Sequence, residues 1–307
     1  MRLRRSQLAV PGASPKMIRQ AAASGADEVF LDLEDSVAPS RKEEARANVI
    51  EGLKNLDWSG KTVSVRINGL GTSLAYRDII EIAEEAGEQL DTVMVPKVAR
   101  PEDVYFVDTL LSQIERRTGL SRRIGIEVLI ETAEGLVNVE KIAFAGLRLE
   151  SLIFGAGDFA ASIEVPSLNI GAQPISYPAH LWHFPMMRIV TAARAAGLQA
   201  IDGPYGAYQD LEGLRVAAGT ARALGFDGKW AVHPAQIEVV HQLFTPTEEE
   251  VRQASAFVEH YSNLSAGSGT GVMTLGGQMV DEASLKMAQQ VLRRAELAAG
   301  PRVGTLV

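Results

Sequence analysis

Short apolar runs alternate with longer amphipathic stretches along most of the chain. Each of eight runs is short enough for one strand, and they cover residues 7–11, 28–33, 62–68, 92–97, 124–131, 149–157, 200–204 and 229–233. The stretches between them have helical length and period, as where Ile18, Ala21, Ala22 and Gly25 share one helical face. The pattern predicts repeated strand–helix units.

Eight strand–helix units in about 240 residues predict a (β/α)8 TIM barrel. A doubly wound open sheet is the alternative, but it usually has fewer repeats and a glycine-rich phosphate turn after its first strand. Here that turn reads Pro-Gly-Ala-Ser-Pro over 11–15, which does not match. Ser14 before a proline predicts a helix start, and 40–43 and 247–250 have the spacing of capping boxes.

The pattern changes after residue 245, so we expect a barrel domain over 1–245 and a C-terminal extension over 246–307. A charged helix is predicted over 248–261, a glycine- and serine-rich stretch over 263–272, and a final helix over 282–297. Glycine and serine in such numbers are typical of flexible loops. The extension is either a linker to a decorative helix or a mobile lid that carries Asp281 to a site.

Composition narrows the classes of protein that fit. The 307 residues are 46% hydrophobic, enough for a sizeable core, and a net charge of −8 argues against a generally basic nucleic-acid-binding face. The chain has no cysteine, which excludes disulfides and thiolate metal sites and fits a cytoplasmic protein, with an organelle matrix left open. No apolar run approaches the roughly 18 residues of a membrane span.

Polar and charged side chains stand at the carboxyl ends of the predicted strands, where barrels of this kind build their active sites. Any one of these residues is equally well explained by a rim salt bridge or a helix cap. Several at the same level are harder to explain by stability alone. They are Asp32, Glu34, Asp35, Arg66, Asn68, Lys97, Glu131, Asp158, Asp202 and His233.

Glu131 and Asp158 end neighbouring predicted strands and are the pair on which we place most weight. Two converging carboxylates either share a proton or bind a hard cation, and Mg²⁺ typically takes one or two carboxylates with water and substrate. Gly155 and Gly157 would let the backbone approach a ligand closely. The site lacks cysteine, and His233 is more than one strand away, so zinc is disfavoured.

Arg66 and Lys97 bring positive charge to the same end. A guanidinium there suits a substrate carboxylate or an enolate oxygen, and it can at the same time pair with Asp32 or Glu34. Lys97 permits a Schiff-base aldolase, but nearby carboxylates would keep its amine protonated and favour an ion pair. Strand alternation predicts that Asp32 and Glu34 face one side and Asp35 the other. We expect Asp32 or Glu34 to hold Arg66 or Lys97, and Asp35 to organise metal-bound water at the rim.

Nine short motifs follow one another in order over nearly the whole chain. They are Arg-Ser…Val-Pro-Gly (5–12), Leu-Asp-Leu-Glu-Asp-Ser-Val (31–37), Arg-Ile-Asn (66–68), Pro-Lys (96–97), Ile-Glu-Thr (130–132), Phe-Gly-Ala-Gly-Asp (154–158), Ala-Ile-Asp (200–202), His-Pro-Ala-Gln (233–236) and Met-Val-Asp (279–281). Each motif is weak alone. As an ordered set they resemble the citrate lyase β-subunit-like (HpcH/HpaI aldolase) family, which includes malyl-CoA and citramalyl-CoA lyases.

The resemblance implies a (β/α)8 barrel that binds Mg²⁺, with Mn²⁺ as the alternative, through Glu131 and Asp158. It implies that Arg66 contacts an α-keto acid and the reacting acyl oxygen, and that a C-terminal lid supplies Asp281 to a neighbouring subunit of a homotrimer or homohexamer. Asp35 completes the expected catalytic set. Substrate would be bound by Arg66, Asp32, Glu34, Lys97 and Gly157, and CoA by Arg5, Lys16, Arg19, Lys42 and His233.

The predicted reaction is reversible cleavage of a carboxylated 3-hydroxyacyl-CoA (malyl-, methylmalyl- or citramalyl-CoA) to acetyl-CoA or propionyl-CoA and glyoxylate or pyruvate. Arg66 would stabilise the thioester enolate, and Asp281 would take a proton from acetyl-CoA in the condensation direction. A malyl-CoA thioesterase and a non-catalytic CoA-binding subunit are the alternatives. The substrate stays open because segment 166–185 can reshape the pocket with Gln173, Tyr177, His180, Trp182 and His183.

Overall fold

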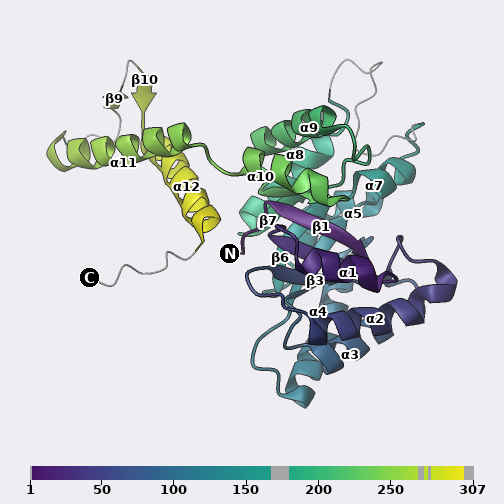
Figure 1. Cartoon of the computed structure of the whole chain (residues 1–307). Coiled ribbons are helices and arrows are strands. Elements are labelled where there is room, and N and C mark those ends of the chain that lie inside the picture. Colours follow the sequence, from purple (N-terminus) through teal and green to yellow (C-terminus); the bar gives the residue numbers. More distant parts are fainter. Residues whose placement is uncertain (1, 167–179, 269–272, 276–277, 301–307) are drawn as a thin grey trace. The chain divides into compact units, whose positions relative to one another are not determined.

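The computed structural model describes residues 2–166, 180–268, 273–275 and 278–300, without the side chains of 264–278. The chain divides into two compact units, Leu3–Leu243 and Phe244–Val307, which Figure 1 shows in the colours of the sequence. The division falls close to residue 245, where the sequence pattern changes.

Within the described residues, eight parallel strands close into a barrel in chain order, with β1 beside β8. All eight predicted strands are present, and the predicted (β/α)8 barrel is confirmed. The strands are β1 (Ser6–Pro11), β2 (Glu28–Asp32), β3 (Thr62–Arg66), β4 (Thr92–Val95), β5 (Gly125–Ile130), β6 (Leu149–Phe154), β7 (Gln199–Asp202) and β8 (Gly228–Ala231).

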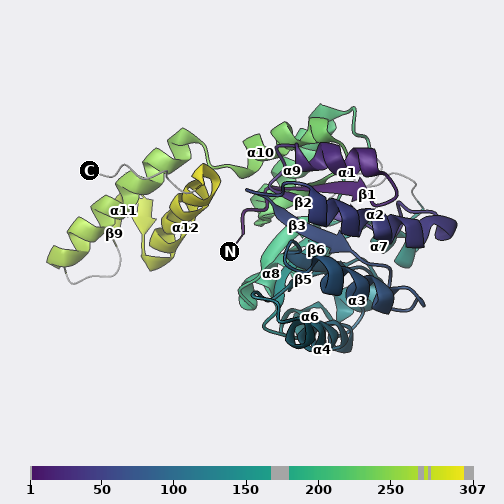
Figure 2. The same cartoon turned by 60° about the horizontal axis from the view of Figure 1, so that its bottom comes forward.

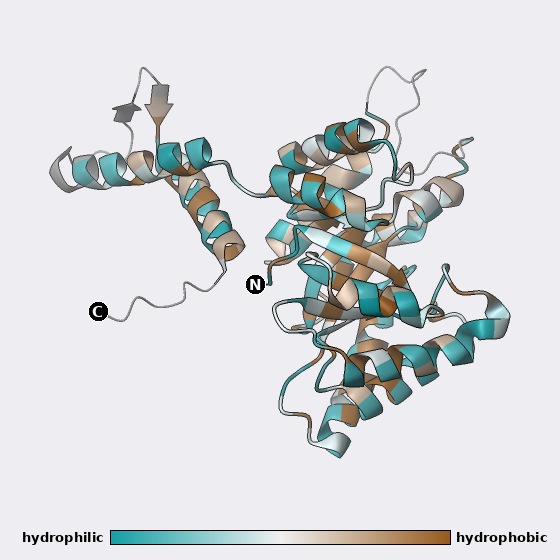
Figure 3. Cartoon of the chain, in the orientation of Figure 1, coloured by the Kyte–Doolittle hydropathy of each residue, from teal (hydrophilic) through white to brown (hydrophobic). Residues whose placement is uncertain are grey.

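Helices follow the strands and surround the barrel (Figure 2). Hydrophilic and hydrophobic residues alternate around them, as expected of helices that bury one face (Figure 3). They are α1 (Pro15–Ala22), α2 (Lys42–Asn55), α3 (Ala75–Ala86), α4 (Pro101–Thr118), α5 (Ala133–Val137), α6 (Val139–Ala143), α7 (Ala156–Ser162), α8 (His183–Ala195), α9 (Leu211–Leu224) and α10 (Ile237–Phe244), with 3₁₀ turns η1 (Pro39–Arg41) and η2 (Pro234–Gln236).

Two of the three helix starts predicted from the sequence are confirmed. The Ser14 hydroxyl caps α1 by accepting a hydrogen bond from the Met17 backbone N–H at 3.4 Å. Residues 247–250 form the predicted reciprocal capping box. The capping box predicted over 40–43 is wrong, because a 3₁₀ turn leads directly into α2, which begins at Lys42 without a side-chain cap.

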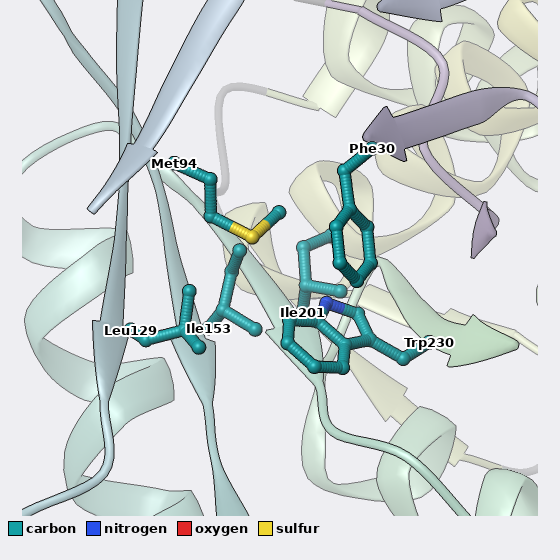
Figure 4. Packing of buried hydrophobic residues seen from close by; sticks show 6 residues of the cluster. All are labelled: Phe30, Met94, Leu129, Ile153, Ile201 and Trp230. Carbon is teal, nitrogen blue, oxygen red and sulfur yellow. The ribbon is translucent and has the colours of Figure 1, made fainter. Parts of the chain in front are cut away.

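The barrel interior is layered. Its middle is a buried apolar cluster, shown in Figure 4, of Phe30, Met94, Leu129, Ile153, Ile201 and Trp230, with Ala9 packed against it. Side chains two positions apart on a strand point the same way. Glu28 and Asp32 therefore lie on either side of Phe30 within the barrel, as Glu127 and Glu131 lie on either side of Leu129. An apolar layer thus separates a polar amino-terminal layer from a charged carboxyl-terminal layer.

The amino-terminal layer is a buried ionic network that the sequence analysis missed. Arg4 donates to Glu28 Oε2 and to Glu150 Oε2, both at 2.7 Å. Gln7 Nε2 donates to Glu28 Oε1 and Glu127 Oε2, both at 2.8 Å. Burial, followed by the charge of Glu127, raises the pKa of Glu28. This end of such barrels serves stability rather than catalysis, and the network closes the barrel floor.

The second unit contains α11 (Glu248–Ser268), an antiparallel pair of β9 (Met273–Leu275) and β10 (Gln278–Val280), and α12 (Glu282–Ala299). The predicted change to a loop at 263 is wrong, because α11 continues to Ser268 and packs against α12, which outweighs the low helix propensity of its serine and glycine. The rest of the glycine- and serine-rich stretch, 269–272, lies outside the described residues. In the described part of the chain, no helix is long and apolar enough to cross a membrane.

Candidate active site

Asp32 and Arg66 are register partners at the ends of β2 and β3. Arg66 donates from Nε and Nη2 to the two oxygens of Asp32, at 2.7 Å each, which confirms the predicted pairing. Burial would raise the pKa of Asp32, but the hydrogen bonds and charge of Arg66 outweigh it and lower that pKa. Asp32 is therefore an ionised anchor that holds the guanidinium by two parallel bonds.

Lys97 bridges carboxylates from two other parts of the rim. Its Nζ lies 2.5 Å from Glu34 Oε1, 3.5 Å from Asp35 Oδ2 and 3.7 Å from Asp158 Oδ1. Burial opposes its charge, but the hydrogen bond and charge of Glu34, with the other carboxylates, raise the pKa of Lys97. The predicted ion pair is present, and a protonated amine is a poor Schiff-base nucleophile.

Glu131 follows β5 and is buried between Lys97 and Gly155. Its Oε1 accepts the backbone N–H of Lys97 at 2.8 Å, and Lys97 has a φ of 53°, which is uncommon outside glycine. A Cβ on Gly155 would lie 2.4 Å from Glu131 Oε2, so the side chain needs glycine there. Burial, with the charges of Glu34 and Asp158, raises the pKa of Glu131 to about 8.

Two local expectations need correction. The strand predicted over 149–157 ends at Phe154, and Gly157 and Asp158 lie in the first turn of α7, where the Asp158 side chain is 40% exposed. The strand β2 ends at Asp32, so alternation does not extend to Asp35. Asp35 does not turn to the other side of the sheet: its side chain, 56% exposed, lies 4.0 Å from Arg66 Nη1.

These side chains form one cluster with excess negative charge, which we call the rim cluster. Among the described residues, five carboxylates surround its two cations, and the members are Asp32, Glu34, Asp35, Glu131, Asp158, Arg66 and Lys97. Glu34 Oε2 lies 3.0 Å from Arg66 Nη1 but has no hydrogen-bond partner although it is buried. Oxygen ligands with surplus negative charge fit a hard divalent cation.

The fit requires ligands from outside the chain. No group of three or more histidine or carboxylate side chains in the described residues is arranged to hold a metal ion. Two carboxylates supplemented by substrate and water oxygens are a common arrangement for Mg²⁺. The rim cluster therefore fits a metal that is completed by its substrate.

Comparison with known proteins decides the family. Residues 5–234 match the model of the HpcH/HpaI aldolase/citrate lyase family. The chain belongs to this family. It is 43% identical over 302 residues to the L-malyl-CoA/beta-methylmalyl-CoA lyase of Cereibacter sphaeroides, covering 95% of each chain. It is 34% identical over 297 residues to the citrate lyase subunit beta of Leuconostoc mesenteroides subsp. cremoris, covering 96% of this chain and 94% of the relative.

Solved structures agree. Protein CitE from Mycobacterium tuberculosis, in complex with magnesium, acetoacetate and coenzyme A, is 31% identical with a TM-score of 0.75, covering 95% of this chain and 98% of that one. A citrate lyase from Burkholderia xenovorans LB400 has a TM-score of 0.83 at 22% identity and supports the fold alone. These findings confirm the resemblance inferred from the motifs and the prediction that the chain is a lyase.

Other predicted strand-end residues of this HpcH/HpaI-family chain have partners of their own. Asn68 donates from its backbone N–H and Nδ2 to Asp78 Oδ2, at 3.0 Å and 2.7 Å. Asp202 pairs with Lys229. Because their neighbours Ile201 and Trp230 point into the barrel, this pair lies on the outer side of the wall. Both contacts are structural.

One of the residues implied by the family resemblance to bind CoA lies at the opposite end of the barrel from the rim cluster. Arg5 precedes β1 and pairs with Asp27 at 2.8 Å, at the amino end of the barrel and thus opposite the rim cluster. Lys42 Nζ donates to the backbone carbonyls of Leu33 and Glu34, at 2.7 Å and 2.6 Å, and so holds the acidic loop after β2.

The remaining CoA candidates are exposed. Lys16 and Arg19 lie on the solvent side of α1. His233 caps η2 by accepting the Ala235 N–H at 3.1 Å, and its ring stacks on Tyr208 with centroids 5.0 Å apart. Their exposure leaves them open to a ligand, and their role stays a prediction.

The segment predicted to reshape the pocket is described only in part. Gln173 and Tyr177 lie outside the described residues, and His183 begins α8. A pocket of about 340 Å³ in this region is lined by Phe154, His180, Trp182, Met186, Asp202 and Lys229, among others. It shares no residue with the rim cluster.

Proposed function

We propose that the protein catalyses reversible carbon–carbon cleavage of a carboxylated 3-hydroxyacyl-CoA, to acetyl-CoA or propionyl-CoA and glyoxylate or pyruvate. The observation that carries the proposal is the rim cluster, in which a buried arginine lies beside carboxylates whose charge its cations do not balance. The relative from Cereibacter sphaeroides, named for malyl-CoA and β-methylmalyl-CoA, supports the substrate class.

Glu131 and Asp158 are the residues that would hold a divalent cation, Mg²⁺ or Mn²⁺. The solved CitE structure that contains magnesium supports this choice. When bound, the ion would act as Lewis acid and template for the carboxylate and carbonyl oxygens of the keto acid. Lys97 and Asp35 would bound the site, with Lys97 limiting the repulsion among the carboxylates.

Arg66 is the residue that would stabilise the developing enolate. Asp32 accepts hydrogen bonds from Nε and Nη2 of Arg66, whereas Nη1 of Arg66 forms no hydrogen bond within the described residues. Nη1 has an ion-pair contact with Glu34 Oε2 at 3.0 Å, and it is the nitrogen that would turn to a substrate oxygen. Charge that appears during the reaction is stabilised most by donors that are already in place, since no reorganisation is then needed.

The proton balance needs two groups. In cleavage a base takes the hydroxyl proton, the C–C bond breaks, and its electrons pass to the thioester as an enolate. In its protonated form, Asp281 of a neighbouring subunit would then protonate the enolate carbon, and in condensation its carboxylate would remove that proton. This assignment implies a homotrimer or homohexamer in which the second unit acts as a lid that excludes water.

A product screen tests the proposal. Acetyl-CoA or propionyl-CoA is incubated with glyoxylate, pyruvate or oxaloacetate and Mg²⁺, and products are identified by mass spectrometry. We expect a condensed acyl-CoA with glyoxylate or pyruvate. Hydrolysis to free CoA without condensation would instead indicate a thioesterase, and no conversion would indicate a binding subunit.

A further inference from the structure

Arg66 rests on an aromatic floor of Phe30 and Trp230. Its Cζ lies 5.5 Å from the Trp230 ring centroid and 5.8 Å from that of Phe30. The two rings lie next to each other (Figure 4). Their centroids are 4.6 Å apart at an angle of 40°, and both residues are buried. Aromatic faces attract cations at this distance, and more strongly where water is excluded.

Trp230 is itself held in place by the buried polar layer at the amino-terminal end of the barrel. Its Nε1 donates to Gln7 Oε1 at 2.7 Å. The amide of Gln7 is held in turn, because its Nε2 donates to Glu28 and Glu127 at 2.8 Å each. A buried indole with a bonded N–H cannot rotate without leaving a polar group unpaired, which is costly. The amino-terminal network therefore sets the orientation of the Trp230 ring.

The aromatic floor of Phe30 and Trp230 restrains the orientation of the Arg66 guanidinium in a way that Asp32 does not. Asp32 accepts two parallel bonds along one edge of the guanidinium, which can still tilt about the line that joins them, and the ion pair of Nη1 with Glu34 Oε2, at 3.0 Å, lacks hydrogen-bond geometry. Ring faces beneath the guanidinium restrict this tilt. The direction of Nη1, which within the described residues has an ion pair with Glu34 but no hydrogen bond, depends on that tilt.

We propose that Trp230 is a positioning residue for Arg66, acting through its ring face, with Gln7 setting the ring. The inference rests on the proposed role of Arg66 toward the keto acid and the enolate. Trp230 neither touches the substrate nor transfers a proton. Its loss should lower kcat and leave the KM for the CoA thioester unchanged, because the constraint acts on transition-state charge.

The contact itself is tested without any activity. The chain has three tryptophans, so 5-fluorotryptophan labelling should give three ¹⁹F resonances, with that of Trp230 assigned by its loss in Trp230→Phe. Arg66→Met removes the charge and keeps an aliphatic chain. We expect it to move the Trp230 resonance and leave those of Trp58 and Trp182 in place. An unmoved Trp230 resonance in folded Arg66→Met overturns the proposal.

The kinetic arm compares three variants. Trp230→Leu, which removes the ring, should lower kcat about 10–30-fold at constant KM for acetyl-CoA. Trp230→Phe keeps a ring but loses the anchored N–H, so its kcat should lie between those of Trp230→Leu and wild type. If Trp230→Leu does not fold, Trp230→Phe takes its place in the test. Trp58→Phe is the matched control, because Trp58 is buried and its N–H donates to Gly52 O at 3.1 Å.

The outcomes separate the two proposals. Wild-type kcat in a folded Trp230→Leu variant overturns the positioning role. If wild type has no lyase turnover at all, the proposed function fails, while the ¹⁹F shift still shows whether the ring and the guanidinium are in contact.

Discussion

At the residue scale, Glu131 links charge to stability. Its pKa rises from 4.5 to about 8 because it is buried beside other carboxylates. A carboxyl that stays protonated in the folded state contributes stability that is present below pH 4.5 and lost as the pH rises toward 8. In EDTA, the unfolding temperature of wild type should therefore fall across this range.

Glu131→Gln tests the assignment, because the amide keeps the shape and cannot ionise. Without metal, the unfolding temperature of this variant should fall less between pH 5 and about 8.5 than that of wild type. If the unfolding temperature falls equally with pH in the two proteins, the titrating group is not Glu131.

Gly155 tests the shape of the same site. In Gly155→Ala the new Cβ would lie 2.4 Å from Glu131 Oε2 and would displace that carboxylate. Misplacing a reacting group by an ångström can cost about 10²-fold, and we expect a fall in kcat of that order together with weaker Mg²⁺ binding by calorimetry.

Gly219→Ala is the matched control for this substitution. It lies in α9 with nothing within 4 Å of the added Cβ. It should keep wild-type kcat and gain about 0.5–1 kcal/mol of stability, since alanine favours a helix. Wild-type turnover in Gly155→Ala would contradict the placement of Glu131.

At the scale of elements, hydrophobic period was enough to locate all eight strands but not their ends. The run over 149–157 stays apolar through Phe154-Gly-Ala-Gly, so composition alone does not show that α7 begins at Ala156. Asp35 was misplaced for a related reason, since alternation holds only while the strand lasts.

The sequence predicted the parts of the site in which strand ends converge, but not the contacts between successive layers of side chains inside the barrel. Asp32, Arg66, Lys97 and Glu131 could be assembled because parallel strands bring their carboxyl ends together. The contact between Arg66 and Trp230 could not, because it depends on which residues of β3 and β8 share a level inside the barrel. The sequence did carry one signal for this contact, because alternation along β8 predicts that the Trp230 side chain points into the barrel.

Asp281 lies at the start of α12, where a structural role and the proposed catalytic role can be separated by substitution. It caps this helix by accepting the N–H groups of Ala283 and Ser284, at 3.0 Å and 3.1 Å. Asp281→Ala removes both the cap and the proposed base, and the lost cap costs about 1 kcal/mol. Asp281→Asn keeps a capping oxygen but cannot take a proton. We expect both variants to lose turnover, and only the alanine variant to lose stability in thermal unfolding. Wild-type kcat in Asp281→Asn would limit Asp281 to a structural cap.

At the scale of the whole molecule, the barrel carries the rim cluster and the second unit carries Asp281. The two are proposed to meet between subunits. Mixing Asp158→Ala chains with Asp281→Asn chains should then restore part of the turnover, because some sites would combine an intact cluster with an intact Asp281. Mixtures as inactive as their components would contradict shared sites.

The most direct measurement of the central claim is the fate of malyl-CoA, followed by mass spectrometry with Mg²⁺ and with EDTA. With Mg²⁺ we expect acetyl-CoA and glyoxylate in equal amounts, and EDTA should stop the reaction until Mg²⁺ is restored. Release of free CoA and malate, or full cleavage in EDTA, would contradict a metal-dependent carbon–carbon lyase.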